Sequence, residues 1–211
     1  AGGDRAADQI WGQALQICQD HVGQAFRQGQ WVLSSEPVTF QAHLGRTYAA
    51  RPIVARTEFK DWVSTMAVKS HRETGMSASL QVAQAILETG WGQYVPVDKY
   101  TGQFSNNLFG MKGKGTAGSI LSTTWEVYNG QRYVVDDYFR AYHNVEENWR
   151  DHKDLLLTRS WYAPFRAVMA DPVLGAWGLK RSGYATDPQY PIKLINLMKQ
   201  HNLFQLDEVE L

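Results

Sequence analysis

An Asn-Gly pair between two runs of β-forming residues constrains the fold of this chain more than any other sequence feature. Residues 123–128 and 133–138 are rich in threonine, valine and aromatic side chains, and Asn129-Gly130 lies between them. Tight hairpin turns need backbone angles that asparagine and glycine adopt readily, so this arrangement is a strong hairpin signal. We therefore predict a two-stranded β-hairpin within residues 119–142.

Helical patterns precede this hairpin. Residues 59–67 repeat apolar side chains at helical spacing, which predicts a helix with one face toward the core. A second helix is predicted over residues 80–89, because Ser77 or Ser79 is available as its N-cap and Gly90 as its end signal.

Three further helix starts are indicated after the hairpin. Asn144, with Glu147 three residues later, fits a capping box. The pairs Asp171-Pro172 and Asp187-Pro188 each place a capping aspartate before a proline at the first helical position. The predicted architecture is mainly α, with one small β-hairpin lobe inserted in the middle of the chain.

The length of 211 residues suits one domain with an N-terminal extension. Residues 8–27 carry apolar side chains at helical spacing, and residues 31–56 contain two prolines without a clear period. We expect residues 1–56 to form a helical and extended N-terminal extension, and residues 57–211 to form the main domain.

Charge and cysteine content exclude several classes of function. The chain has 21 basic and 21 acidic residues, so no overall field would attract it to nucleic acid or to an anionic membrane. Cys18 is the only cysteine, which excludes an intrachain disulfide and a cysteine-based metal site. No apolar stretch approaches the roughly 20 residues that span a bilayer, and no signal peptide is recognisable. We expect a monomer that neither inserts into a membrane nor binds nucleic acid.

Glu88 is the first candidate for acid catalysis. A carboxylate in the last turn of a helix faces the negative end of the helix dipole, and Trp91 nearby would remove water from it. Both effects favour the protonated carboxyl, and cleavage of a glycosidic bond requires a proton held near working pH. The alternative is a solvated glutamate at a surface helix end.

Glu126 is the second candidate. On an alternating strand it shares one face with Ser122, Thr124 and Tyr128, which would give a polar surface able to line a groove. An ordinary exposed strand face fits this pattern equally well.

Other chemical motifs are missing from the sequence. The six histidines, His143 and His152 among them, have no metal-ligand spacing, so each is expected to be satisfied or solvated. The glycines and lysines of residues 110–118 lack the order of a P-loop, and no serine nucleophile elbow is present. Neither a metal nor a cofactor is expected.

Five segments, in this order along the chain, resemble glycoside hydrolase family seventy-three, the β-N-acetylglucosaminidases that include many autolysins. The segments are QVAQAILETGWG around Glu88, SNNLFGMKG at residues 105–113, TTWEVYNG around Glu126, DYFRAY around Phe139 and GYATDPQYPIKL from Gly183 onward. Together they extend over about residues 58 to 202. The resemblance implies a lysozyme-like fold, a helical body with a small β-lobe, which agrees with the patterns above.

The resemblance also implies roles for single residues. Glu88 matches the family's general acid, and Glu126 matches a second acidic residue that activates water or helps to bind substrate. Tyr184 matches a tyrosine that orients the acetamido group or stabilises the oxocarbenium-like transition state. The positions expected to contact sugar or to support the site are Trp91, Asn106, Phe109 and Tyr190.

The implied function is hydrolysis of peptidoglycan at the β-1,4 bond between N-acetylglucosamine and N-acetylmuramic acid. The partner would be the glycan strands of peptidoglycan, met outside the cytoplasm by a protein that is secreted, in the cell wall or in the periplasm. Residues 57–211 would be the catalytic domain. Alternatives are a muramidase or lytic transglycosylase on the same fold, or a non-catalytic module that binds cell-wall glycan. An inverting or substrate-assisted route is expected ahead of a covalent one.

Overall fold

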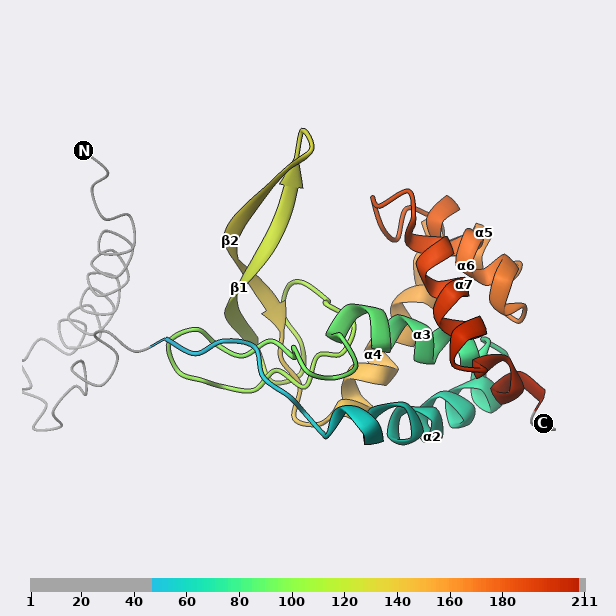
Figure 1. The fold of residues 1–211 in the computed structure, drawn as a ribbon, viewed down its shortest axis with the longest axis horizontal. Helices are drawn as coiled ribbons and strands as arrows, with labels where there is room; N and C mark the ends of the chain where they lie inside the picture. The colour runs from blue at the N-terminus through green and yellow to red at the C-terminus, as the bar shows by residue number, and fades with distance from the viewer. Residues whose placement is uncertain (1–46, 209–211) are drawn as a thin grey trace, which may run out of the picture. The chain divides into compact units, whose positions relative to one another are not determined.

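The computed structural model describes residues 47–208, in which one β-hairpin lobe projects from a body of helices (Figure 1). In chain order the elements are α2 (Arg56–Thr74), α3 (Ala78–Thr89), β1 (Ser119–Tyr128), β2 (Gln131–Arg140), α4 (Val145–Thr158), the 3-10 turn η2 (Ser160–Tyr162), α5 (Ala163–Arg166), α6 (Pro172–Arg181), α7 (Tyr190–Gln200) and the 3-10 helix η3 (Leu203–Glu208). The expected mainly α fold with a small hairpin lobe is confirmed. The helix expected over residues 8–27 and Cys18 lie outside the described residues.

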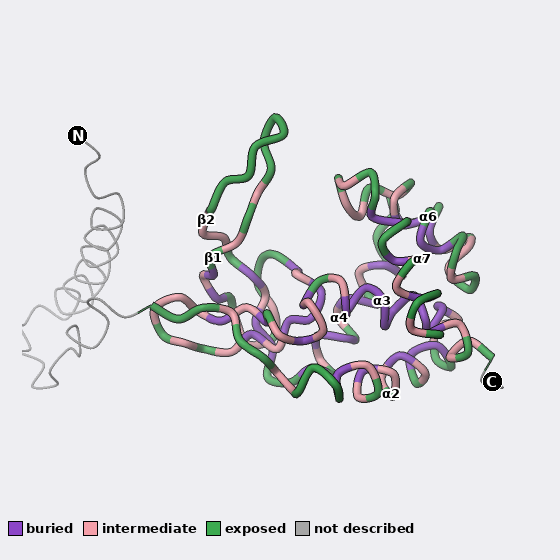
Figure 2. The backbone as a smooth tube through the Cα atoms, viewed as in Figure 1, coloured by how far each residue is buried: buried purple, intermediate pink, exposed green. Residues whose placement is uncertain are grey.

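Helix α3 is the central element of the core. Its residues from Ala78 to Ile86 are all buried (Figure 2), and the helix packs against α2, α6, α7 and η3. Gln81 also takes part in this packing, because its side-chain oxygen accepts a hydrogen bond of 2.8 Å from Trp149 Nε1 on α4. A helix that is covered on every side is held by tertiary packing rather than by helix propensity.

The start of α3 is fixed by two side chains. Ser77 is the N-cap, and its hydroxyl accepts a hydrogen bond of 3.1 Å from Leu80 N. The carboxylate of Asp207, on η3, accepts hydrogen bonds from Ala78 N at 2.6 Å and from the hydroxyls of Ser77 and Ser79. A carboxylate at a helix N-terminus is favourable because it satisfies free N–H groups at the positive end of the dipole. The C-terminal segment is thereby tied to the central helix.

The end of α3 needs an unusual backbone. Gly90, Trp91 and Gly92 have φ angles of 55°, 64° and 73°, so three successive residues are left-handed. A Cβ added at Gly92 would lie 2.2 Å from Cδ2 of the fully buried Phe59 ring. Glycine is therefore required at position 92 both for its backbone angle and for space.

The predicted hairpin is confirmed. Strands β1 and β2 pair in antiparallel register from Ser119 with Arg140 to Tyr128 with Gln131, and the turn is formed by residues 129–130. Only the base is buried, where Ile120 and Phe139 form a small cluster with Ala141, whereas the outer half is exposed (Figure 2). The hairpin is thus anchored at one end.

A loop between α3 and β1 holds the base of the hairpin. Asp98 accepts a hydrogen bond of 3.0 Å from Leu121 N, and Lys99 N donates one of 2.7 Å to Leu121 O. The Lys99 ammonium also forms an ion pair of 2.9 Å with Asp136 on β2. These contacts connect both strands to the helical body.

One of the two predicted Asp-Pro caps is wrong. Asp171 caps α6 as expected, because its side chain accepts from Val173 N and Leu174 N at 2.9 and 2.8 Å. Asp187 instead accepts from Gln189 N within a turn, and α7 begins only at Tyr190, with a second proline in its first turn. Pro188 suits that turn as well as a helix start, so the dipeptide alone does not distinguish them.

The capping box at α4 is confirmed in part. Asn144 accepts a hydrogen bond of 2.8 Å from Glu147 N, while the Glu147 carboxylate accepts from His143 N rather than from Asn144 N.

No helix within residues 47–208 is long and apolar enough to cross a bilayer.

We expect Gly92→Ala to lower the free energy of unfolding by about 3 kcal/mol. The left-handed backbone contributes about 1–2 kcal/mol, and the overlap with Phe59 contributes a further 1–3 kcal/mol, roughly. Gly75→Ala is the matched control, because Gly75 has φ 74° but no atom within 4 Å of its added Cβ. Urea unfolding measures both variants. Equal losses would show that the contact with Phe59 has no energetic effect.

Candidate active site

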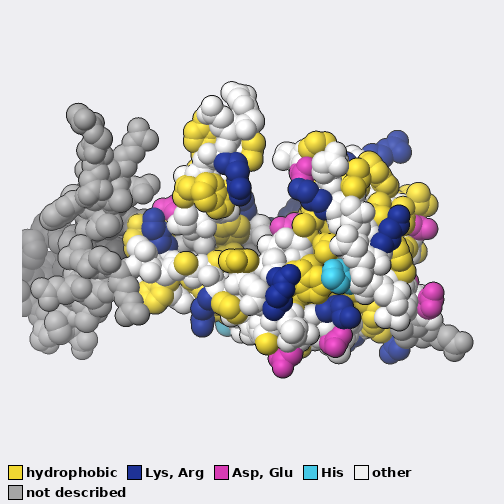
Figure 3. Space-filling view, viewed as in Figure 1, with side chains coloured by type: hydrophobic (Ala, Val, Ile, Leu, Met, Phe, Trp, Pro, Cys, Tyr) yellow, Lys and Arg dark blue, Asp and Glu magenta, His cyan; other side chains and the backbone are white. Residues whose placement is uncertain are grey.

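Ten residues from separate parts of the chain line one cleft of about 270 Å³. They come from the end of α3, the loop before β1, the end of β2, α4, η2 and the loop between α6 and α7. Figure 3 shows the surface hollowed between the hairpin and the C-terminal helices. The lining residues are Glu88, Phe109, Gly110, Met111, Lys112, Arg140, His152, Leu155, Tyr162 and Tyr184.

Glu88 is open to the cleft, yet protein atoms lie densely around its carboxyl group. Its side chain has substantial accessible area, while a Cβ added at Gly110 would lie only 3.2 Å from Glu88 Oε2. The density of the surrounding protein, more than the accessible area, determines how poorly a charge is solvated here. Desolvation raises the pKa of Glu88 from 4.5 to about 7, against an opposing effect of a hydrogen bond from Tyr190. The carboxyl therefore holds a proton near neutral pH.

Two tyrosines lie beside this carboxyl. The Tyr190 hydroxyl donates a long hydrogen bond of 3.5 Å to Glu88 Oε1 and accepts one of 3.2 Å from Gln84 Nε2. The ring of Tyr184 stacks on that of Tyr190, with centroids 5.7 Å apart. Burial is the main cause that raises the pKa of each hydroxyl well above 10, so both stay protonated.

The loop before β1 brings Phe109 and Gly110 to the cleft. Asn107 holds this loop from inside, because its amide donates to Met111 O and Arg140 O at 2.8 and 3.0 Å and its oxygen accepts from two loop N–H groups. Asn106 does not line the cleft; its amide donates to Tyr142 O at 2.9 Å. The sequence pattern drew attention to Asn106, whereas Asn107 is the buried residue that shapes the loop.

His152 has a larger part in the cleft than the sequence indicated. Its Nε2 lies 2.8 Å from the Tyr184 hydroxyl oxygen, and its ring stacks on Phe109 at 3.8 Å. The residue is fully buried. Helical spacing places His152 on the same face of α4 as Trp149 and Leu156, which is the signal that would have indicated its inward position.

Glu126 lies on the hairpin in a cluster of three charged side chains with Lys112 and Asp137. The Lys112 ammonium lies 2.6 Å from Glu126 Oε1 and 2.6 Å from Asp137 Oδ2. Hydrogen bonds to Asp137 and then to Glu126 raise the pKa of Lys112, and the Lys112 hydrogen bond lowers the pKa of Asp137. Lys112 lines the cleft, so this ionised cluster borders it on the hairpin side.

Trp91 does not line the cleft. Its half-buried ring packs edge-on against His201 at 4.5 Å and under the Arg56 guanidinium at 5.2 Å. The structure therefore brings together Glu88, Phe109, Tyr184 and Tyr190, and it leaves Trp91 and Asn106 in supporting positions.

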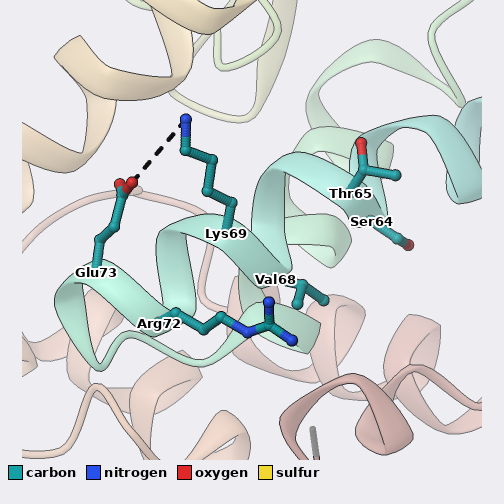
Figure 4. A pocket seen from close by; sticks show the side chains of 6 residues that line it. All are labelled: Ser64, Thr65, Val68, Lys69, Arg72 and Glu73. Carbon is teal, nitrogen blue, oxygen red and sulfur yellow. Dashed lines mark ion pairs between the residues drawn. The ribbon is translucent and has the colours of Figure 1, made fainter. Parts of the chain in front are cut away.

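A larger hollow of about 530 Å³ lies along α2 (Figure 4), but all its lining residues come from that one helix. Its Lys69–Glu73 pair is exposed and 4.0 Å apart. Within residues 47–208, no group of three or more potential ligands is placed to hold a metal ion. The cleft at Glu88 is the better candidate for chemistry.

Sequence comparison identifies relatives of this chain. The profile of the family described as mannosyl-glycoprotein endo-β-N-acetylglucosaminidase matches residues 64–203. The peptidoglycan hydrolase FlgJ of Pseudomonas aeruginosa is 33% identical over 150 residues, which cover 70% of this chain and 37% of that protein. The exo-glucosaminidase LytG of Bacillus subtilis is 35% identical over 139 residues, which cover 62% of this chain and 46% of that protein. The matched region thus spans less than half the length of these curated relatives.

Solved structures with the same fold include two hydrolases. A mutant peptidoglycan hydrolase from Sphingomonas sp. A1 is 35% identical, with a TM-score of 0.60 over 74% of this chain and 100% of that one. A truncated glycoside hydrolase domain of Salmonella typhimurium FlgJ is 33% identical, with a TM-score of 0.56 over 70% of this chain and 98% of that one.

The raised pKa of Glu88 predicts a pH dependence of stability. The folded-state value lies above the ordinary one, so this group's contribution to stability is fully present below about pH 4.5 and is lost as pH rises through about 7. Glu88→Gln removes the ionisable group. We therefore expect the Tm of Glu88→Gln, relative to the unsubstituted protein, to be higher at pH 8 than at pH 4.5.

Thermal unfolding followed by circular dichroism tests this expectation. Glu58→Gln is the matched control, since Glu58 is an exposed glutamate of α2 that does not line the cleft. A Tm difference for Glu88→Gln that does not change with pH would contradict the raised pKa.

Proposed function

Because this chain belongs to the glucosaminidase family, glycoside hydrolase family seventy-three, we propose that it hydrolyses peptidoglycan at the β-1,4 bond between N-acetylglucosamine and N-acetylmuramic acid. The expected family resemblance is confirmed. The observation that carries the proposal is a carboxyl in a cleft, Glu88, whose pKa of about 7 leaves it a proton to donate at neutral pH.

Glu88 acts as the general acid in this proposal. It donates its proton to the glycosidic oxygen as the bond to the anomeric carbon breaks, and the leaving sugar departs as a neutral alcohol. The Tyr190 hydroxyl, held by Gln84, stabilises the carboxylate that remains. A pure glycan-binding module has no need of an acid with this raised pKa.

The opposite face of the anomeric carbon involves Tyr184 and Glu126. Tyr184 orients the 2-acetamido group, whose oxygen attacks the anomeric carbon as the bond to the leaving sugar breaks. Water then opens the resulting oxazoline and gives its proton to the Glu88 carboxylate. Glu126 is paired with Lys112 at 2.6 Å, so its carboxylate is already engaged by a cation. This pairing supports the substrate-assisted route. An inverting route requires Glu126 to leave Lys112 and activate water.

The remaining expectations follow the same proposal. Phe109 and Tyr190 contact or support the sugar, while Trp91 and Asn106 hold the surrounding loops. Peptidoglycan is the proposed partner, in keeping with the peptidoglycan hydrolases among the relatives, and the proposed form is a monomer that acts outside the cytoplasm. Residues 57–211 are the proposed catalytic domain. Residues preceding α2 also contact it, since Arg51 and Val95 exchange two backbone hydrogen bonds of 3.0 Å.

Glu88→Gln should lower the rate of peptidoglycan hydrolysis by about 10²–10⁴-fold, because the amide keeps the shape of the side chain but has no proton to transfer. The turbidity of purified cell walls measures this rate, and circular dichroism checks that the variant is folded. Glu58→Gln is the control and should keep full activity. Near-normal turnover by folded Glu88→Gln would contradict the assignment of the acid.

In the unsubstituted protein, kcat/KM should fall about tenfold per pH unit above about pH 7.

The bond that is cut can be read from the new reducing ends. Digested peptidoglycan, reduced with borohydride and analysed by mass spectrometry, should contain reduced N-acetylglucosamine. Reduced muramic acid would identify a muramidase instead, and anhydromuramic ends would identify a lytic transglycosylase.

A further inference from the structure

Three side chains form a hydrogen-bonded line from the helical core to the cleft. Lys153 Nζ lies 2.8 Å from His152 Nδ1, and His152 Nε2 lies 2.8 Å from the Tyr184 hydroxyl oxygen. His152 has no exposed surface, and Lys153 is 3% exposed. Tyr184 lines the cleft with Glu88, so the line ends where the sugar would bind.

Burying a lysine at position 153 costs more desolvation free energy than burying an apolar side chain there would. Within residues 47–208 no carboxylate lies within 4.0 Å of its ammonium. The rings of Phe109 and Trp149 lie 4.0 and 4.5 Å from the ammonium. Burial lowers the pKa of Lys153 well below its ordinary value. A methionine would fill this space without a charge to desolvate, so packing alone does not account for the lysine.

The donors of Lys153 determine which nitrogen of His152 carries the hydrogen. In its ammonium form, which the two aromatic faces favour against the effect of burial, Lys153 has three N–H donors and no acceptor. His152 Nδ1 accepts from this form, so the hydrogen of the neutral ring lies on Nε2. Burial, and next the charge of Lys153, hold the pKa of His152 well below its ordinary value, which keeps the ring neutral. Stacking on Phe109 fixes the plane of the ring.

This tautomer sets the direction of the Tyr184 hydroxyl. His152 Nε2–H donates to the Tyr184 oxygen, which leaves the hydrogen of the hydroxyl available to another acceptor. Burial, followed by the nearby Tyr190 and Glu88, raises the pKa of Tyr184 well above 10, so that hydrogen is retained. The acetamido carbonyl oxygen of N-acetylglucosamine is an acceptor of the matching kind.

We propose that His152 and Lys153 are positioning residues that aim the Tyr184 hydroxyl, as a hydrogen-bond donor, at the acetamido carbonyl oxygen of the substrate. The inference rests on the proposed function. Neither residue touches the reacting atoms, and both act through Tyr184. The line thereby selects sugars whose 2-substituent offers an acceptor in that place.

The first test is spectroscopic and needs no substrate. In protein labelled with ¹⁵N-histidine, the ring nitrogen shifts distinguish the two neutral tautomers, and His152→Gln identifies the signals of His152. The unsubstituted protein should show His152 with its hydrogen on Nε2, and Lys153→Met should shift it toward a mixture. A hydrogen on Nδ1 in the unsubstituted protein would overturn the inference.

The second test is a double-mutant cycle on kcat. Lys153→Met should fold with equal or greater stability, yet lower kcat about tenfold, as expected for a lost or misdirected hydrogen bond. Tyr184→Phe should lower kcat at least as much, and Lys153→Met should have no further effect when added to it. Lys69→Met, at an exposed lysine of α2, is the control and should change neither quantity.

The outcomes separate the two proposals. Independent, additive losses in the cycle, or a normal kcat for folded Lys153→Met, would overturn the positioning role. His152→Gln keeps an N–H near the place of Nε2 and should retain more activity than His152→Phe. If the unsubstituted protein did not hydrolyse peptidoglycan, the proposed function would fail, and the tautomer measurement would decide the positioning role by itself.

Discussion

The burial of α3 is the constraint on which the rest of the described structure depends. Because the helix is covered by α2, α6, α7 and η3, its axis and rotation are fixed, and so is the position of Glu88 in its last turn. The chain leaves this buried helix through the left-handed residues 90–92. It then folds back so that Gly110 lies against the Glu88 carboxyl. Core packing and the raised pKa of the acid are therefore consequences of the same arrangement.

The two sides of the cleft favour different charge states of their side chains. On the helical side, burial favours the uncharged forms of Glu88, Tyr184 and Tyr190. On the hairpin side, Lys112 forms ion pairs of 2.6 Å with Glu126 and Asp137, and its hydrogen bond lowers the pKa of Asp137. The surroundings thus move the pKa values of two carboxyl groups, Glu88 and Asp137, in opposite directions, so that one cleft can hold a proton donor beside an anion.

Local patterns predicted those elements whose signals lie within a few residues. The hairpin follows from Asn129-Gly130 between β-forming runs, and the end of α3 follows from Gly90. The sequence offered Ser77 or Ser79 as the N-cap of α3, and the structure shows that Ser77 is the cap. The same reasoning misjudged Asp187-Pro188, because a turn and a helix start use the same two residues. The candidate acid was identified from its place in a helix and a motif, while its pKa arises from distant residues that pack around it.

Local spacing and residue type were enough to predict the helical class, the position of the hairpin, the family and the residues that carry its motifs. What those residues contact depends on tertiary packing. It joined Lys153, His152 and Tyr184 across a sequence separation of about 30 residues, and it paired Lys112 with Glu126 rather than leaving either free. These contacts depend on how buried helices pack and on which polar groups need a hydrogen-bond partner away from water. Both conditions involve residues far apart in the sequence, so no single segment of the chain shows them.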